Sequence, residues 1–511
     1  MANNWDELNQ KTLELFQEGK YEQALAAADA AVEYAKNAGD GQHLALALSN
    51  AGEMYQTLGD AVGAENAKKQ ALETYKEVYG QQHVETAAAM YSLGVLYLEQ
   101  GRFEAAENMF RQELTVREAV QGSEHVDLVQ TLVGLGECLR GRGNQSEARS
   151  HLQRAVTIME GIWQDSNPEL GPVLVALSDT YQEDHELEQG GTLLRRAIRI
   201  YENTVGPEHP AFVEALSKLA ENYMARRIYQ AAQPLLEQAI AILKELFSEE
   251  EPEIARLLEL LAQTYQAMGQ AEKVEENLKK AADIYRKALG DEDPAVAQVE
   301  NTLGEVYFEQ DKLEQAKPLY ESALNIRKKA LGDGHPAVAQ SMNNMAVLLS
   351  RENKFDEAET LHLQALEIRR NSFGPKHLVV TQSLENLAGV YQSMEKYSQA
   401  EELLEEAISI WEENVGKDHR SIAEDCYNLG ALLFVEDKLE EAEKVLHRAR
   451  QILNDMYGRD HLNMCAVYNA LSAVYEKLGR VGESREYMAR CAQIYKKEWA
   501  RMDKENGKEK K

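Results

Sequence analysis

Large apolar and aromatic residues recur at intervals of 42 residues along almost the whole chain. They are Tyr55, Tyr97, Leu139, Tyr181, Tyr223, Tyr265, Tyr307, Leu349, Tyr391, Leu433 and Tyr475. Four residues before each lies a second apolar residue, mostly Leu, followed by a small one, as in Leu303-Gly304 and Leu387-Ala388. Large residues at i and i+4 with a small residue between them form a face that a neighbouring helix can approach closely. The pattern predicts the first helix, helix A, of a repeating unit.

A second apolar period begins after a short turn in each unit, for example at Ala358, Ala365 and Ile368. Its helical spacing predicts a second helix, helix B. A glycine at the end of helix B supplies the left-handed backbone of a C-cap, and a proline four residues later suits the first turn of the next helix. The glycines are Gly80, Gly122, Gly206, Gly290, Gly332, Gly374, Gly416 and Gly458, and the prolines are Pro168, Pro210, Pro252, Pro294 and Pro336.

The 42-residue interval holds from the first to the last of these units without an insertion, and an earlier unit built on Leu13, Tyr21 and Ala24 brings the number to about twelve. A helix pair of this kind buries its apolar face only by stacking on its neighbours, so we expect one continuous core in an all-α solenoid. The expected organisation is a first repeat in 1–40, an array of eleven repeats forming one solenoid domain in 41–499, and a polar, disordered tail in 500–511.

The charge of the chain limits the partners that it can bind. The formal net charge is −31, from 86 acidic and 55 basic residues. Such a surface repels nucleic acid and anionic membranes, so we expect protein or peptide partners that are neutral or basic. Cys138, Cys426, Cys465 and Cys491 show no CxxC spacing, which favours a reducing compartment. No leader or long apolar stretch is evident, so the expected location is cytoplasmic, without membrane insertion.

Three sequence elements together resemble the tetratricopeptide repeat family: Leu-Ala/Gly-x-x-Tyr, Lys-Tyr/Phe-x-x-Ala-Glu and Ala-Leu-x-Ile. The 42-residue length, the linker Leu331 to Pro336 and the helix start Asn343 to Ala346 look most like the kinesin light chain subtype. The resemblance implies a right-handed superhelical solenoid of helix-turn-helix repeats. Kinesin light chains carry heptads before their repeats, whereas this chain opens directly into a repeat, which argues against a motor-adaptor role.

No signature of catalysis is found in the sequence. GxxxxGK[ST], HExxH and GxSxG are absent, so we expect no enzymatic activity, no catalytic residues and no cofactor. Seven histidines share one repeat position, but residues one repeat apart are separated by two packed helices and cannot converge on one metal ion. We expect these histidines to cap or pack at the helix junctions. They are His83, His125, His209, His335, His377, His419 and His461.

The resemblance implies that the A helices line a concave groove, and that positions five, six and nine residues before the recurring aromatic point into it. Asparagine is a poor interior helix residue, so its recurrence there requires an explanation. One interpretation is a ladder of amides that binds the backbone of an extended peptide; the other is that the asparagines cap or bridge neighbouring A helices. The candidate peptide-binding residues are Gln298, Asn301, Phe308, Gln340, Asn343, Asn344, Gln382, Asn386, Tyr427, Asn428, Phe434 and Asn469.

The first half of the chain lacks this ladder, because Ser92, Gly134, Ala176, Lys218 and Leu260 occupy its principal position. Binding is therefore expected mainly in repeats 8–12. The leading hypothesis is a non-catalytic scaffold or adaptor that binds a protein or an extended peptide. The alternatives are a scaffold that self-associates through apolar ends, and a regulatory module that senses a peptide or small ligand.

Overall fold

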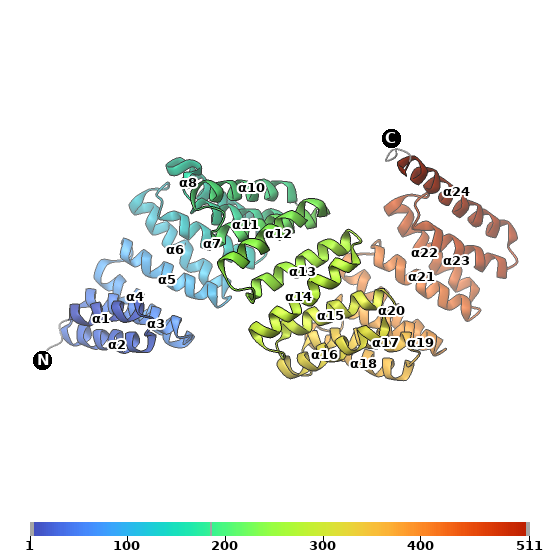
Figure 1. Cartoon of the computed structure of the whole chain (residues 1–511), viewed down its shortest axis with the longest axis horizontal. Coiled ribbons are helices and arrows are strands. Elements are labelled where there is room, and N and C mark those ends of the chain that lie inside the picture. The colour runs from blue at the N-terminus through green and yellow to red at the C-terminus, as the bar shows by residue number, and fades with distance from the viewer. Residues whose placement is uncertain (1–4, 184–185, 507–511) are drawn as a thin grey trace. The chain divides into compact units, whose positions relative to one another are not determined.

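The computed structural model describes residues 5–183 and 186–506, and within them it contains 24 α-helices and no strand (Figure 1). The predicted all-α solenoid of two-helix repeats is confirmed. Odd-numbered helices are the A helices and even-numbered ones the B helices. No helix in this part of the chain combines the length and the apolar character needed to cross a membrane.

The chain divides into two compact units, unit 1 at Met1–Gln270 and unit 2 at Ala271–Lys511. Unit 1 contains α1 (Trp5–Gln17), α2 (Tyr21–Ala38), α3 (Gly41–Thr57), α4 (Ala61–Tyr79), α5 (Val84–Glu99), α6 (Phe103–Gln121), α7 (Leu128–Gly141), α8 (Gln145–Trp163), a short 3₁₀ turn η1 (Gln164–Ser166), α9 (Leu170–Glu183), α10 (Leu187–Thr204), α11 (Pro210–Ala225), α12 (Tyr229–Leu246) and α13 (Pro252–Ala267).

Unit 2 contains α14 (Ala271–Leu289), α15 (Pro294–Glu309), α16 (Leu313–Leu331), α17 (Pro336–Arg351), α18 (Phe355–Phe373), α19 (Val379–Ser393), α20 (Tyr397–Val415), α21 (Arg420–Val435), α22 (Leu439–Tyr457), α23 (Met464–Lys477) and α24 (Val481–Asn506). The repeat interval continues without a break from one unit into the next. The expected tail, 500–511, begins inside α24, so its first residues are helical, and 507–511 lie outside the described residues.

Small residues on the A helices allow the close packing that the pattern predicted. A Cβ atom added to Gly94 would lie 2.8 Å from the ring of Phe110, and one added to Gly304 would lie 2.6 Å from the ring of Tyr320. Both rings are buried. Helices A and B therefore approach each other across a glycine, and a larger side chain there would displace a core aromatic.

Four of the seven histidines, His83, His209, His335 and His419, are the N-caps of their A helices, and the other three lie one or two residues before the N-cap. In all seven, Nδ1 accepts a hydrogen bond from the backbone N–H two residues later, at 3.1–3.3 Å. The glycines that end the B helices have the predicted positive φ, but their ψ is not that of the left-handed helix. Gly80 has φ 87° and ψ 170°, and Gly374 has φ 91° and ψ 154°. This region is open essentially to glycine alone, so each linker depends on its glycine.

Candidate functional site

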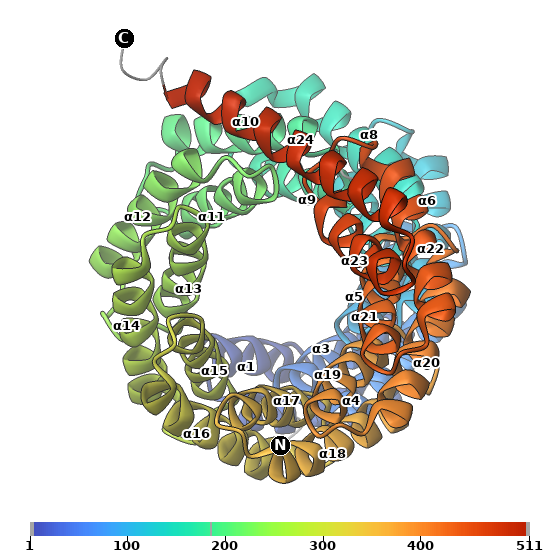
Figure 2. The ribbon, with the colours of Figure 1, turned by 90° about the vertical axis from the view of Figure 1, so that its right-hand side faces the viewer.

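All twelve candidate residues lie on A helices of unit 2. Figure 2 shows α15, α17, α19, α21 and α23 along the inner side of the unit and their B helices along the outer side. The candidates lie on these five A helices. The helix assignment is therefore as predicted, but the side chains differ in their burial and in their hydrogen-bond partners.

Two candidates, Asn301 and Asn343, are buried at 3% and 2% exposure, so their expected exposure is wrong. Asn343 Oδ1 is hydrogen-bonded to Nδ1 of the buried His362 at 2.8 Å, and Asn343 Nδ2 donates to Ser383 Oγ at 3.4 Å. Burial, together with the charge of Arg369, lowers the pKa of His362 to about 4. The position six residues before the aromatic faces neighbouring helices, so Asn343 is a core residue.

Several candidates form a closed network between α15 and α17. Asn344 Nδ2 donates to Asn301 Oδ1 at 3.1 Å and to Glu305 Oε1 at 2.6 Å, and Asn301 Nδ2 donates to the same carboxylate oxygen at 2.8 Å. Gln340 Nε2 donates to Asn344 Oδ1 at 3.2 Å. In these two repeats the amides bridge neighbouring A helices, which is the structural interpretation that the sequence left open.

Four further amides have no such partners. Within the described residues, the side chains of Gln382, Asn386, Asn428 and Asn469 form no hydrogen bond, and all but the half-buried Asn386 are exposed. They lie on three consecutive A helices, α19, α21 and α23, near the half-buried Tyr427 of α21. Their donors and acceptors are open to a ligand.

The two candidate aromatics are each covered by a cation from the next A helix. Arg351 lies 5.8 Å from the ring centroid of Phe308, and Lys477 lies 5.0 Å from that of Phe434. These contacts are cation–π pairs at the surface, each worth about 0.5–1 kcal/mol. A ligand that stacks on either ring has to displace the cation.

Buried arginines connect the repeats of unit 2. Arg327 on α16 donates to Ser341 Oγ at 2.8 Å and to Gln298 Oε1 at 2.6 Å. Arg369 on α18 repeats this arrangement with Ser383 and Gln340, each at 2.8 Å. Burial lowers the pKa of both arginines. The repeat pattern did not predict that these arginines are buried, although each stands at the end of an Ile-Arg pair in an apolar helix face.

The next repeat departs from this arrangement. Trp411 replaces the arginine and Asp425 replaces the serine. Asp425 is 2% exposed, and its Oδ2 has no hydrogen-bond partner in the described part of the chain. Burial and the charges of Glu385 and Glu424 raise the pKa of Asp425 to about 8. Asp425 is therefore largely protonated at neutral pH, and the acidic charge around α19 and α21 comes from the neighbouring Glu385 and Glu424.

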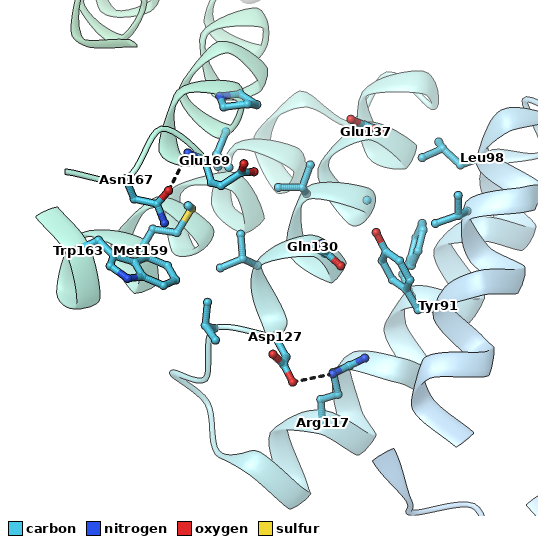
Figure 3. Close-up of a pocket in the computed structure, with 18 of the residues that line it drawn as sticks. Tyr91, Leu98, Arg117, Asp127, Gln130, Glu137, Met159, Trp163, Asn167 and Glu169 are labelled. Carbon is cyan, nitrogen blue, oxygen red and sulfur yellow. Dashed lines mark hydrogen bonds and ion pairs between the residues drawn. The ribbon is translucent and has the colours of Figure 1, made fainter. Parts of the chain in front are cut away.

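Unit 1 contains a hollow of about 770 Å³ on α5, α7, α8 and α9 (Figure 3). Its apolar walls include Val95, Val133, Trp163 and Val173, and the buried ring of Phe110 lies beneath them. A Cβ atom added to Gly134 would lie 2.8 Å from that ring. The hollow lies in the half of the chain that has no amide ladder. Its signal in the sequence was the valine-rich start of α7 together with Gly134.

The rim of this hollow carries carboxylates. Glu99, Asp127, Glu137 and Glu169 line it, and its one cation, Arg117, bonds to Asp127 at 3.2 Å and to the buried Glu113. Burial raises the pKa of Glu137. Its charge balance is therefore negative, as on the concave side of unit 2.

Neither surface has features of a metal or thiol site. Among the described residues, no group of three or more His, Cys, Asp or Glu side chains is placed to hold a metal ion. All four cysteines are buried, and burial raises the pKa of Cys138 to about 12 and of Cys426 to about 11. A thiol with a raised pKa is a poor nucleophile near neutral pH.

Comparisons with known proteins agree with this architecture. A family model described as tetratricopeptide repeat matches most of the chain, at residues 44–119, 170–245, 212–287, 253–329, 295–371, 339–413, 380–433 and 421–497. No curated protein sequence matches the chain. Among solved structures, BtubC (BKLC) from P. vanneervenii is 26% identical with a TM-score of 0.39, and the match covers 44% of this chain and 90% of that one.

Repeats described as those of a kinesin light chain are also similar. A structure of Podosopora anserina putative kinesin light chain nearly identical TPR-like repeats is 25% identical with a TM-score of 0.38, covering 40% of this chain and 98% of that one. Its Q17M form is 27% identical with a TM-score of 0.37, covering 40% and 97%.

Proposed function

Because the chain belongs to the tetratricopeptide repeat family, we propose that it is a non-catalytic scaffold that binds an extended peptide segment of a partner protein in repeats 8–12. Repeats of this family generally serve as protein-interaction scaffolds. Within repeats 8–12, the main contacts are made by α19, α21 and α23. The closed network on α15 and α17 shapes the beginning of the groove and contributes little direct binding.

The observation that carries this proposal is the set of unpartnered amides, Gln382, Asn386, Asn428 and Asn469, on three consecutive A helices. An amide side chain both donates and accepts hydrogen bonds, and an extended peptide backbone offers both groups along its length. The acidic residues around Asp425 favour a neutral or basic peptide over an acidic one.

The test is a selection of peptides from a random display library on the full chain, followed by affinity measurement with the selected peptides. The triple variant Asn386→Ala, Asn428→Ala and Asn469→Ala should weaken binding by roughly tenfold or more, since each lost hydrogen bond costs about 0.5–1.5 kcal/mol. Alanine favours the helix, so circular dichroism should be unchanged. Unchanged affinity for every selected peptide contradicts the groove.

A matched control removes exposed amides from the B helices. Asn371, Gln399 and Gln451 are exposed and lie on α18, α20 and α22. Their replacement by Ala removes the same number of amide groups from the outer side of unit 2. We expect no loss of affinity in this control.

A second candidate function is self-association through the end of the chain. Met488, Tyr495 and Trp499 on α24 are 57%, 52% and 72% exposed. Exposed apolar side chains grouped on one helix are typical of interaction sites. Light scattering over a range of concentrations tests this candidate, and a constant monomer mass excludes it.

A further inference from the structure

The hollow of unit 1 differs in chemistry from the groove of unit 2. It is walled by aliphatic and aromatic side chains and its volume, about 770 Å³, falls in the range of ligand pockets. Gly134 leaves out the side chain that would otherwise cross it. The lining offers little to a peptide backbone and much to an apolar side chain that inserts from above.

In unit 2 the corresponding repeat positions carry larger side chains that fill the space. Comparing the two units therefore identifies the residues whose small size leaves the hollow open in unit 1. Five repeats further along the chain, Asn344 stands in place of Gly134, and Arg369 stands in place of Met159. The guanidinium of Arg369 and the amides around it fill unit 2 with hydrogen-bonded polar groups. In unit 1, Met159 and Val173 replace Arg369 and Ser383, and Gln130, which corresponds to Gln340, has no arginine to bind, so the space stays open.

The rim of the hollow provides charges without partners. Glu137 and Glu169 form no side-chain hydrogen bond or ion pair within the described residues, whereas Glu99 accepts from Gln56 Nε2 at 2.5 Å. The cation of the lining, Arg117, is held by carboxylates on its own side of the hollow. A ligand that brings positive charge to the rim gains attraction from Glu137 and Glu169, and an acidic ligand is repelled.

We propose that this hollow is a second peptide-binding site, which takes one aromatic or long aliphatic side chain of a partner protein flanked by Lys or Arg. The apolar side chain fills the space above Phe110, and the flanking cations pair with Glu137 and Glu169. Large apolar anchors in desolvated pockets surrounded by charged rims are the usual centres of binding energy. The site is separate in residues and chemistry from the groove proposed for unit 2.

The experiment uses the same display selection on the full chain and sorts the enriched peptides by the variant that abolishes their binding. The variant Glu137→Lys with Glu169→Lys reverses the rim charge at two side chains that lack partners. Peptides that bind the hollow should contain a large apolar residue beside Lys or Arg. Their affinity for this variant should be lower than for the native chain by roughly tenfold or more. Glu124→Lys with Glu208→Lys, at exposed positions outside the hollow, is the charge-matched control and should retain binding.

A second variant tests the hollow itself. Val133→Phe places an aromatic ring in the space proposed for the ligand and leaves the rim charges in place. Binding should be lost with thermal unfolding unchanged, and alanine in place of the apolar peptide residue should cause the same loss. If Val133→Phe fails to fold, Trp163 fluorescence of the native chain is measured during peptide titration instead. Trp163 lines the hollow, so its fluorescence should change when a peptide binds there.

Several results overturn the proposal. They are an absence of any enriched basic-apolar peptide, an enrichment of acidic peptides, or binding that survives both Val133→Phe and the rim reversal. Light scattering provides one more: if self-association is lost in both Trp499→Ala and the rim reversal, the occupant is a second copy of this chain. If the unit 2 alanine variant leaves peptide affinity unchanged while the unit 1 variants reduce it, the groove of unit 2 is contradicted and the hollow of unit 1 is supported. The two proposals can therefore be rejected independently.

Discussion

The hollow of unit 1 and the corresponding part of unit 2 are built on the same repeat positions and reach opposite results. Phe110 and Tyr320 occupy one position, and a glycine of the preceding A helix packs on each ring. On the other side of Phe110 lies Gly134, whereas Asn344 holds that position in unit 2. The helical framework is constant, and the residues that fill its concave side decide whether a surface is hollow or closed.

This difference shows that stability and recognition are assigned to separate positions of the repeat. The residues of helix packing keep their type in both units, because a change there alters the core. Other positions around the same rings vary from Val133 and Met159 in unit 1 to Asn343 and Arg369 in unit 2, while the helices that carry them begin and end at closely similar repeat positions. Exchanging residues between the two regions tests this division.

The largest expected effect comes from the aromatic beneath the hollow. Phe110→Ala should destabilise unit 1 by about 3–5 kcal/mol, because it removes a fully buried ring and enlarges a cavity. Amide hydrogen exchange should show the loss of protection in α5 to α8 and little change in unit 2. Tyr320→Ala is the reciprocal variant, and loss of protection spread equally over both units would contradict independent local packing.

Asp425→Ser restores the residue found at Ser341 and Ser383, and it should stabilise unit 2. The native pKa of Asp425 is about 8, above the ordinary value of 3.8, so the unfolded chain releases this proton first as the pH rises. The contribution of Asp425 to the free energy of unfolding therefore decreases as the pH rises from about 4 to about 8. The variant should gain of order 3 kcal/mol at pH 7, below the roughly 4 kcal/mol that the raised pKa costs at this pH, because serine is smaller and leaves space unfilled.

Denaturant unfolding at pH 4 and at pH 7 measures this effect. The gain should fall to roughly 0.5 kcal/mol at pH 4, because this pH is close to the ordinary pKa of 3.8 and the unfolded state then gains little from ionisation. A gain that is equal at the two pH values would show that repacking, and not the buried carboxyl, is responsible.

The pair Asn343 and His362 corresponds to Val133 and Leu152 in unit 1. The native pKa of His362 is about 4, below its ordinary value of 6.5, so the unfolded chain binds a proton first as the pH falls. Stability should decline from pH 7 to pH 5 by about 2 kcal/mol through this histidine. The double variant Asn343→Val with His362→Leu should remove that part of the decline, since both hydrogen-bonding partners are replaced together.

Unfolding at pH 8 and pH 5, compared between the native chain and the double variant, provides the measurement. Asn343→Ala alone is the control: it leaves the buried imidazole without its 2.8 Å partner, and it should destabilise unit 2 at both pH values. Identical pH dependence in the native chain and the double variant would contradict the assignment to His362.

The smallest effect on stability is expected from exchanging Gly134 and Asn344, which occupy the same repeat position in the two units. Gly134→Asn gives unit 1 the side chain of unit 2, and its Cβ atom has to displace the ring of Phe110, at about 1–2 kcal/mol. It should also abolish the basic-apolar class of peptides. Asn344→Gly is the reverse exchange and should cost about 1 kcal/mol, mainly because it removes the hydrogen bonds to Asn301 and Glu305, with a smaller part from the lower helix propensity of glycine. Thermal unfolding and peptide affinity measure both.

Much of this fold could be predicted from the sequence because its determinants are local. The 42-residue period, the histidine caps and the glycine linkers each depend on a few residues close in the chain. The candidate site could be predicted only in part. Asn343 and Asn344 are adjacent and chemically identical, but one is buried and the other half-buried, because a helix turns about 100° between them.

The buried polar groups were harder still to predict. Arginine is usually a surface residue. Arg327 and Arg369 are buried because each finds a hydrogen-bond partner, Ser341 or Ser383, across a helix interface. The hollow of unit 1 results from what several helices lack at once, and a single chain position gives no sign of it. The sequence pattern predicts the helices, but it does not predict which side chains from different helices fit together in the folded chain.

The local nature of the linkers has a consequence for how such a chain can evolve. Most junctions between repeats carry a glycine, several carry a histidine that accepts a hydrogen bond from the start of the next A helix, and these contacts stay within a few residues. A duplication or deletion of a whole 42-residue segment therefore leaves every helix end intact. Array length and the order of concave surfaces become variables that recombination can change in single steps. A hollow such as that of unit 1 can be moved, copied or lost together with its repeats, without redesign of the framework.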